Sequence, residues 1–191
     1  MTTFPQLTAG LPDGAFANDG LLTKRFLRAT ALAALAPIGG ELLWDLGAGS
    51  GSISIEWCRL SATNRAVAVE RQSDRVDRIR VNAATHSVTS QLEIRRGAIA
   101  ELLPLLPAPD AVFVGGGVES ITLDAAWDRL RADGRLVAHS VTAESDAILL
   151  GAYQTHGGEL TRVAVETAEP IGRFTGFRPS RTVTCWAATK L

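Results

Sequence analysis

Apolar and polar positions along the chain follow two alternating patterns. Short apolar runs bounded by turn residues are typical of strands buried in a parallel sheet, and they occur at residues 42–46, 66–69, 92–94, 111–114 and 136–138. Several of the stretches between them have helical spacing instead. This βαβα alternation predicts an α/β fold, a Rossmann-like, doubly wound and mostly parallel sheet with helices on both faces.

The first part of the chain has a different character. Residues 1–20 are rich in Gly, Pro and Asp and predict an irregular N-terminal arm. The alanine-rich segment 21–36 predicts a first helix, which Pro37 ends. Thr23 stands where a side chain could cap this helix.

Further helices are expected between the strands. Ser73 is placed to cap a helix in which Val76, Ile79 and Ala83 recur at helical spacing. Similar stretches follow Gly51, Gly117 and Ala143.

The last part of the chain breaks the alternation. Residues 159–167 and 181–189 have the pattern of two strands, and the segment between them has the composition of a loop. Two consecutive strands without a crossover helix must pair antiparallel. With no internal repeat, residues 1–191 are expected to form a single domain that ends in an antiparallel strand pair.

Composition excludes several classes of protein. With 46% hydrophobic and 20% charged residues the chain is globular. Nineteen basic and twenty acidic residues give a net charge of −1, which disfavours nucleic acid as a partner. Cys58 and Cys185 have apolar neighbours, which favours buried thiols over a disulfide. Without a signal-peptide pattern or a long apolar run, we expect no membrane partner and a cytoplasmic location.

The segment LLWDLGAGSG, residues 42–51, carries the clearest chemical signal. Asp45 closes the apolar run and glycine follows at every second position, where the backbone can take positive φ and approach a ligand. The helix start that follows presents unpaired N–H groups. Glu70 comes nineteen residues after Gly51, where an acid can accept hydrogen bonds from ribose hydroxyls. Together they predict a nucleoside-bearing cofactor.

The spacing indicates which cofactor. The dinucleotide pattern is G-x-G-x-x-G, and it remains an alternative, as does a purely structural turn. Asp45 and the G-x-G-x-G run resemble the D-x-G-x-G-x-G motif of class I S-adenosyl-L-methionine (SAM) methyltransferases, which share the antiparallel final strand pair. This resemblance implies SAM contacts from Asp45, Gly47, Ala48, Gly49, Ser50, Gly51, Glu70, Arg71, Gly97 and Ala98.

The methyl acceptor is expected at the end of the fourth strand. Residues 110–118, DAVFVGGGV, contain no polar group that could hold an exocyclic amine, which disfavours base methylation. No acid and His cluster has metal-ligand spacing, so no metal is expected. Gly115, Gly116 and Gly117 fit either a lip for a bulky flat group or a tight turn.

Six segments together resemble the decarboxylating precorrin methyltransferases of cobalamin (vitamin B12) biosynthesis, a family that also forms the C-terminal part of two-domain C5,15-methyltransferases. The segments are 10–16, 21–29, 42–56, 112–117, 139–145 and 169–177. The resemblance implies methylation of C15 of a precorrin tetrapyrrole and decarboxylation of its C12 acetate. It also implies a SAM contact from Thr23, a homotetramer, and a fused or separate C5-methylating partner domain.

A polycarboxylate substrate calls for basic groups. Lys24, Arg25 and Arg28 lie in the first predicted helix, and Arg173, Arg178 and Arg181 lie in the terminal loop. Phe174 and Phe177 alternate with these arginines and could cover the macrocycle face. For any single arginine a solvated charge is the favoured interpretation, whereas the loop set taken together favours substrate binding.

Two candidate catalytic residues lie near the fifth strand. His139 ends it and could relay a proton to the decarboxylated carbon, although a structural bond to the backbone is the alternative. Glu144 follows a few residues later. A class I methyltransferase for RNA or protein, or a non-catalytic SAM-binding subunit, are the competing functions.

Overall fold

The computed structural model describes residues 8–191. The strands are β1 (Leu42–Leu46), β2 (Arg65–Glu70), β3 (Leu92–Arg96), β4 (Ala111–Val114), β5 (Arg135–Ser140), β6 (Glu159–Val163), β7 (Glu166–Ile171), β8 (Phe174–Pro179) and β9 (Val183–Thr189). The α-helices are α1 (Arg25–Leu35), α2 (Ser52–Leu60), α3 (Ser73–Thr85), α4 (Ile99–Leu102), α5 (Ser120–Arg129) and α6 (Ala143–His156). Two 3-10 turns are η1 (Asp13–Ala15) and η2 (Leu103–Leu105).

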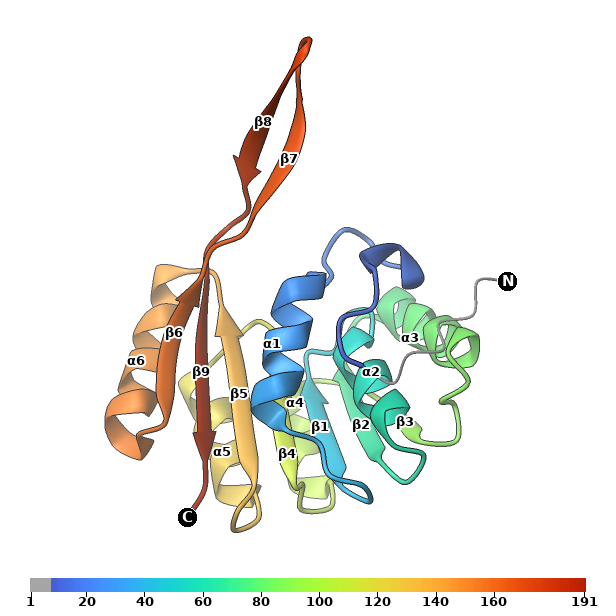
Figure 1. The fold of residues 1–191 in the computed structure, drawn as a ribbon. Helices are drawn as coiled ribbons and strands as arrows, with labels where there is room; N and C mark the ends of the chain where they lie inside the picture. Colours follow the sequence, from blue (N-terminus) through green and yellow to red (C-terminus); the bar gives the residue numbers. More distant parts are fainter. Residues whose placement is uncertain (1–7) are drawn as a thin grey trace.

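Seven strands form one twisted sheet in the order β3-β2-β1-β4-β5-β9-β6 (Figure 1). Neighbours from β3 to β5 are parallel, and β9 is antiparallel to both β5 and β6. The strand order reverses between β1 and β4, and ligands in such sheets bind beyond the strand ends at this switch point. The predicted fold class, including the antiparallel terminal pair, is confirmed.

Helices cover the sheet on both faces, which gives two hydrophobic cores. On β1, Leu43 packs in the core beneath α1, α2 and α3, whereas Trp44 and Leu46 pack in the core beneath α5 and α6. Because alternate residues point to opposite buried faces, the strand sequence is continuously apolar. Cys58 and Cys185 are buried as free thiols, as the sequence predicted.

The predicted helix starts and caps were partly wrong. Residues 1–7 of the predicted arm lie outside the described residues. The first helix begins at Arg25 instead of residue 21, and Thr23 does not cap it. The Arg25 N–H instead donates to Asp13 Oδ1 at 2.9 Å, so an acid from the arm caps the helix across the fold. Ser73 is the first residue of α3 and also makes no capping bond.

The terminal loop is a β-hairpin. β7 and β8 pair antiparallel, and Gly172, with φ +58°, opens the two-residue turn that joins them. The hairpin leaves the carboxyl edge of the sheet and projects away from it (Figure 1). The predicted strands 159–167 and 181–189 are correspondingly shorter, because the chain leaves the main sheet after Val163 and rejoins it at Val183.

A buried ion pair fastens the N-terminal arm. Arg28 and Glu56 are fully or almost fully buried, with Arg28 Nε 2.8 Å from Glu56 Oε1. The same carboxylate accepts hydrogen bonds from the Gly10 and Leu11 N–H groups, and Arg28 Nη1 donates to Asp13 Oδ1 at 2.9 Å. The expectation that Arg28 could bind a substrate carboxylate is therefore wrong, because its guanidinium is enclosed by the arm.

Replacing Arg28 tests this arrangement. Arg28→Met should lower the free energy of unfolding by about 3–5 kcal/mol, because Glu56 would stay buried without its counter-charge. Urea denaturation followed by circular dichroism measures the loss. Arg25→Met, at an exposed position of the same helix, is the control, and Arg28→Met/Glu56→Leu should recover part of the stability. A loss in the single variant no larger than in the control would contradict the assignment.

Candidate functional site

A cavity of about 790 Å³ lies at the carboxyl edge of the sheet, beside the switch point. The turns after β1, β2, β3, β4 and β5 line it, together with the arm and the segment between β8 and β9. The sequence-predicted residues in its lining are Thr23, Lys24, Asp45, Gly47, Ala48, Gly49, Ser50, Glu70, Arg71, Gly97, Ala98, Gly115, Gly116, Gly117, His139 and Arg181. Gly51, Glu144, Arg173, Phe174 and Arg178 are not in the lining.

The glycine-rich turn after β1 takes a conformation that favours glycine. Gly47, Gly49 and Gly51 have φ of +76°, +58° and +74°. A Cβ on Gly49 would lie 3.6 Å from the Leu21 carbonyl oxygen of the arm, whereas one on Gly51 would lie 2.9 Å from Ile79 of α3. Gly47 and Gly49 thus shape the cavity, and Gly51 lets α2 and α3 pack closely.

Asp45 supports the start of α2 from below the turn. Its Oδ2 accepts hydrogen bonds from Ser54 Oγ at 2.6 Å and from the Ser54 N–H at 3.2 Å. Burial raises the pKa of Asp45 to about 6, and the nearby negative charge of Glu70 adds to the shift. The residue therefore has a structural role in addition to lining the cavity.

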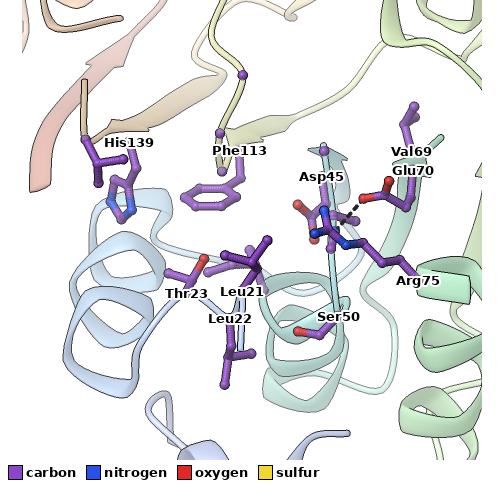
Figure 2. A pocket seen from close by; sticks show the side chains of 18 of the residues that line it. Leu21, Leu22, Thr23, Asp45, Ser50, Val69, Glu70, Arg75, Phe113 and His139 are labelled. Atoms are coloured by element: carbon purple, nitrogen blue, oxygen red, sulfur yellow. Dashed lines mark hydrogen bonds between the residues drawn. The ribbon is translucent and has the colours of Figure 1, made fainter. Parts of the chain in front are cut away.

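Glu70 joins the end of β2 to the glycine turn. Its Oε2 accepts a hydrogen bond from the Gly49 N–H at 2.9 Å, the dashed line in Figure 2, and its Oε1 accepts one from the Gln72 N–H at 2.9 Å. Each oxygen keeps a further lone pair. A buried acceptor that lines the cavity in this way can receive hydroxyl groups of a ligand.

His139 and Phe113 form an uncharged part of the cavity lining. Figure 2 shows His139 and Phe113 side by side, across from Asp45, Glu70 and Arg75. The two rings meet edge to face with centroids 5.1 Å apart. Nε2 of His139 is buried and has no hydrogen-bond partner among the described residues, and burial lowers the pKa of His139 to about 4.

The end of the arm and the residues that follow it form one wall of the cavity, of which sequence reasoning had named only Thr23 and Lys24. Residues 20–24 line it, and Asp19 Oδ2 binds Arg75 Nε at 2.9 Å and Arg78 Nη1 at 3.0 Å. Arg75 also lines the cavity. Its position in the first turn of α3, five residues after Glu70, was the signal that could have found it.

The hairpin residues lie outside this cavity. Arg173 stacks over Phe174 at 5.0 Å, and Arg178 pairs with Glu169 at 3.1 Å on the exposed ribbon. Phe174 and Phe177 are three positions apart on one strand, so their rings lie on opposite faces of the hairpin. The sequence had suggested that both rings cover one face of the macrocycle. Within one chain this arrangement is not possible.

Glu144, the second candidate catalytic residue, is exposed in the first turn of α6. Carboxylates there are favoured by the helix dipole whatever their function. Within residues 8–191, no group of three or more His, Cys, Asp or Glu could bind a metal ion, and no helix is long and apolar enough to cross a membrane.

The strand order, with its antiparallel seventh strand and a glycine turn and acid at adjoining strand ends, defines a class I methyltransferase fold. A family model described as a precorrin methyltransferase domain matches residues 14–190. The chain therefore belongs to the precorrin methyltransferase family, and the resemblance in the sequence is confirmed.

Three relatives show how close the likeness is. The chain is 45% identical over 185 residues to the precorrin-6Y C(5,15)-methyltransferase [decarboxylating] of Sinorhizobium sp., a match covering 96% of this chain and 45% of that one. The chain is 31% identical to a probable cobalt-precorrin-6B C(15)-methyltransferase (decarboxylating) of Pyrobaculum aerophilum. This match covers 93% of this chain and 94% of that one. The crystal structure of the C-terminal domain of the Rhodobacter capsulatus precorrin-6Y C5,15-methyltransferase superposes with a TM-score of 0.92 at 41% identity, covering 97% of this chain and 100% of that one.

The raised pKa of Asp45 predicts a pH-dependent stability. Since the folded state binds this proton more tightly than the unfolded state, stability should fall as pH rises from about 4 through 6 and then level off. Asp45→Asn removes the titration. The wild type should therefore lose roughly 2–3 kcal/mol of unfolding free energy relative to this variant as the pH rises from about 4 to 8. Denaturant unfolding at several pH values measures the difference. If the difference in unfolding free energy between the variant and the wild type stays constant with pH, the raised pKa of Asp45 is refuted.

Proposed function

We propose that the chain methylates C15 of a precorrin tetrapyrrole with SAM and removes carbon dioxide from the C12 acetate side chain, in cobalamin biosynthesis. Relatives across its whole length are named for this chemistry. The observation that carries the proposal is that the glycine turn and Glu70 face one cavity large enough for a cofactor and part of a substrate.

The residues on the acidic side of the cavity fit SAM. Gly47 and Gly49 present a side-chain-free backbone, and Glu70 presents a carboxylate with lone pairs to spare. By the family resemblance the loop 47–51, of which residues 47–50 line the cavity, would hold the methionine part, Glu70 the ribose, and Gly97-Ala98 the adenine. Thr23 and Arg71 line the same cavity. When bound, SAM supplies the methyl group.

The remainder of the cavity would hold the tetrapyrrole. Its electron-rich ring carbon is itself the nucleophile, so the protein contributes alignment and a dry pocket. Lys24 and Arg181 are cations of the cavity lining, and each can bind a carboxylate. Gly115, Gly116 and Gly117 leave room for a flat group beside them.

The chain spans about half the length of the curated relative from Sinorhizobium sp.. A C5-methylating partner domain, fused or separate, is therefore part of the proposal. We also propose a cytoplasmic homo-oligomer, a tetramer by the family resemblance. The exposed apolar side chains of the hairpin support self-association, since Ile171, Phe174 and Phe177 have little contact within the chain.

A turnover assay tests the proposal. With SAM and a precorrin substrate, mass spectrometry should show the gain of a methyl group and the loss of carbon dioxide in the same product. Glu70→Ala should weaken SAM binding by about 1–3 kcal/mol through the lost charged hydrogen bonds, and calorimetry measures this. Glu93→Ala, on the exposed end strand β3, is the matched control. Binding of SAM without turnover of any tetrapyrrole would favour a non-catalytic subunit.

Substrate binding is tested with two arginines of the same segment. Arg181→Ala should raise the KM for the tetrapyrrole roughly 10-fold or more by removing a charged hydrogen bond, and should leave the Kd for SAM unchanged. Arg178→Ala is the control, because its side chain pairs with Glu169 outside the cavity. If both substitutions change KM equally, Arg181 has no special part in substrate binding and the prediction is wrong.

A further inference from the structure

His139 is a buried polar side chain that the fold does not need for any hydrogen bond. It is 5% exposed, it lines the cavity, and its Nε2 has no partner among the described residues. Leaving a buried polar atom unpaired is unfavourable, and such groups in native proteins call for an explanation. The alternative that His139 is merely bonded to the backbone fails for this nitrogen.

Two observations indicate that the ring is a neutral imidazole. Phe113 packs edge to face against it and contributes no charge. Burial lowers its pKa to about 4, so the ring carries one N–H and one free nitrogen at neutral pH. A ring nitrogen without a protein partner leaves the tautomer free to change, since the partner of one nitrogen normally fixes it.

We propose that His139 is a catalytic residue of the decarboxylation step and returns a proton to the side-chain carbon that loses carbon dioxide. This rests on the proposed function. The bond between the acetate methylene and its carboxylate carbon breaks, carbon dioxide leaves, and the electron pair enters the conjugated macrocycle. The methylene carbon then takes one proton and becomes a methyl group.

The imidazole supplies that proton from one ring nitrogen and is neutral again at the end of the cycle. After carbon dioxide and the product leave, a proton from water replaces the one given to carbon. One proton is consumed for each carbon dioxide released. Glu119 also lines the cavity but is exposed, which makes it the comparison residue for the test.

The test separates the two chemical steps. His139→Phe and His139→Gln should lower the rate of carbon dioxide loss by 100-fold or more, the contribution typical of a positioned proton donor. Methyl transfer should change less than 10-fold, so a methylated product that retains its carboxylate accumulates in the mass spectrum. Calorimetry with SAM shows whether each variant is folded and competent to bind. Imidazole added to His139→Ala should restore decarboxylation, which a purely structural role would not allow.

Controls decide between the outcomes. His156→Phe changes a histidine that stacks on Trp127 away from the cavity, and both rates should match the wild type. Unchanged decarboxylation in the His139 variants, an equal loss of both steps, or a selective loss in Glu119→Gln would each overturn the role of His139. If the wild-type chain fails to methylate the tetrapyrrole, the proposed function itself fails, and this inference falls with it.

Discussion

The buried ion pair between Arg28 and Glu56 is the constraint on which the cavity wall depends. Taking two charges out of water costs several kcal/mol for each ion, and the pair persists because the arm completes its hydrogen bonds. Glu56 accepts the Gly10 and Leu11 N–H groups, and Arg28 reaches Asp13. Asp13 in turn caps α1. The path of the arm, and with it the placement of residues 20–24 over the glycine turn, follows from this network.

Beneath the arm, the cavity presents two acids at one place and an uncharged aromatic surface at another. Asp45 and Glu70 lie on one side and act on each other electrostatically, which suits the positively charged sulfonium of the proposed cofactor. His139 and Phe113 form an uncharged surface on the other side. A carboxylate is less stabilised there than beside a cation, so an apolar setting favours its loss as carbon dioxide. One cavity can thus serve two different reactions.

Part of this structure could be predicted because its signals are local. β1 and β4 were predicted to the residue, since a strand buried on both faces reads as one apolar run. The hairpin was missed because both of its faces are exposed, and no core imposes a pattern on residues 166–179. The caps at Thr23 and Ser73 were wrong because local capping rules cannot see a partner such as Asp13, which arrives from another part of the chain.

By itself the sequence determined the alternation of strands and helices in the main sheet, the glycine turn with its acid, and the family. Each depends on residue types at short or fixed spacing along the chain. Only the tertiary structure decided that Arg28 is buried, that Gly51 serves helix packing, that Arg178 lies outside the cavity while Arg181 lines it, and that His139 has an unpaired nitrogen. Burial and partnership are properties of groups brought together from distant positions, and no local pattern encodes them.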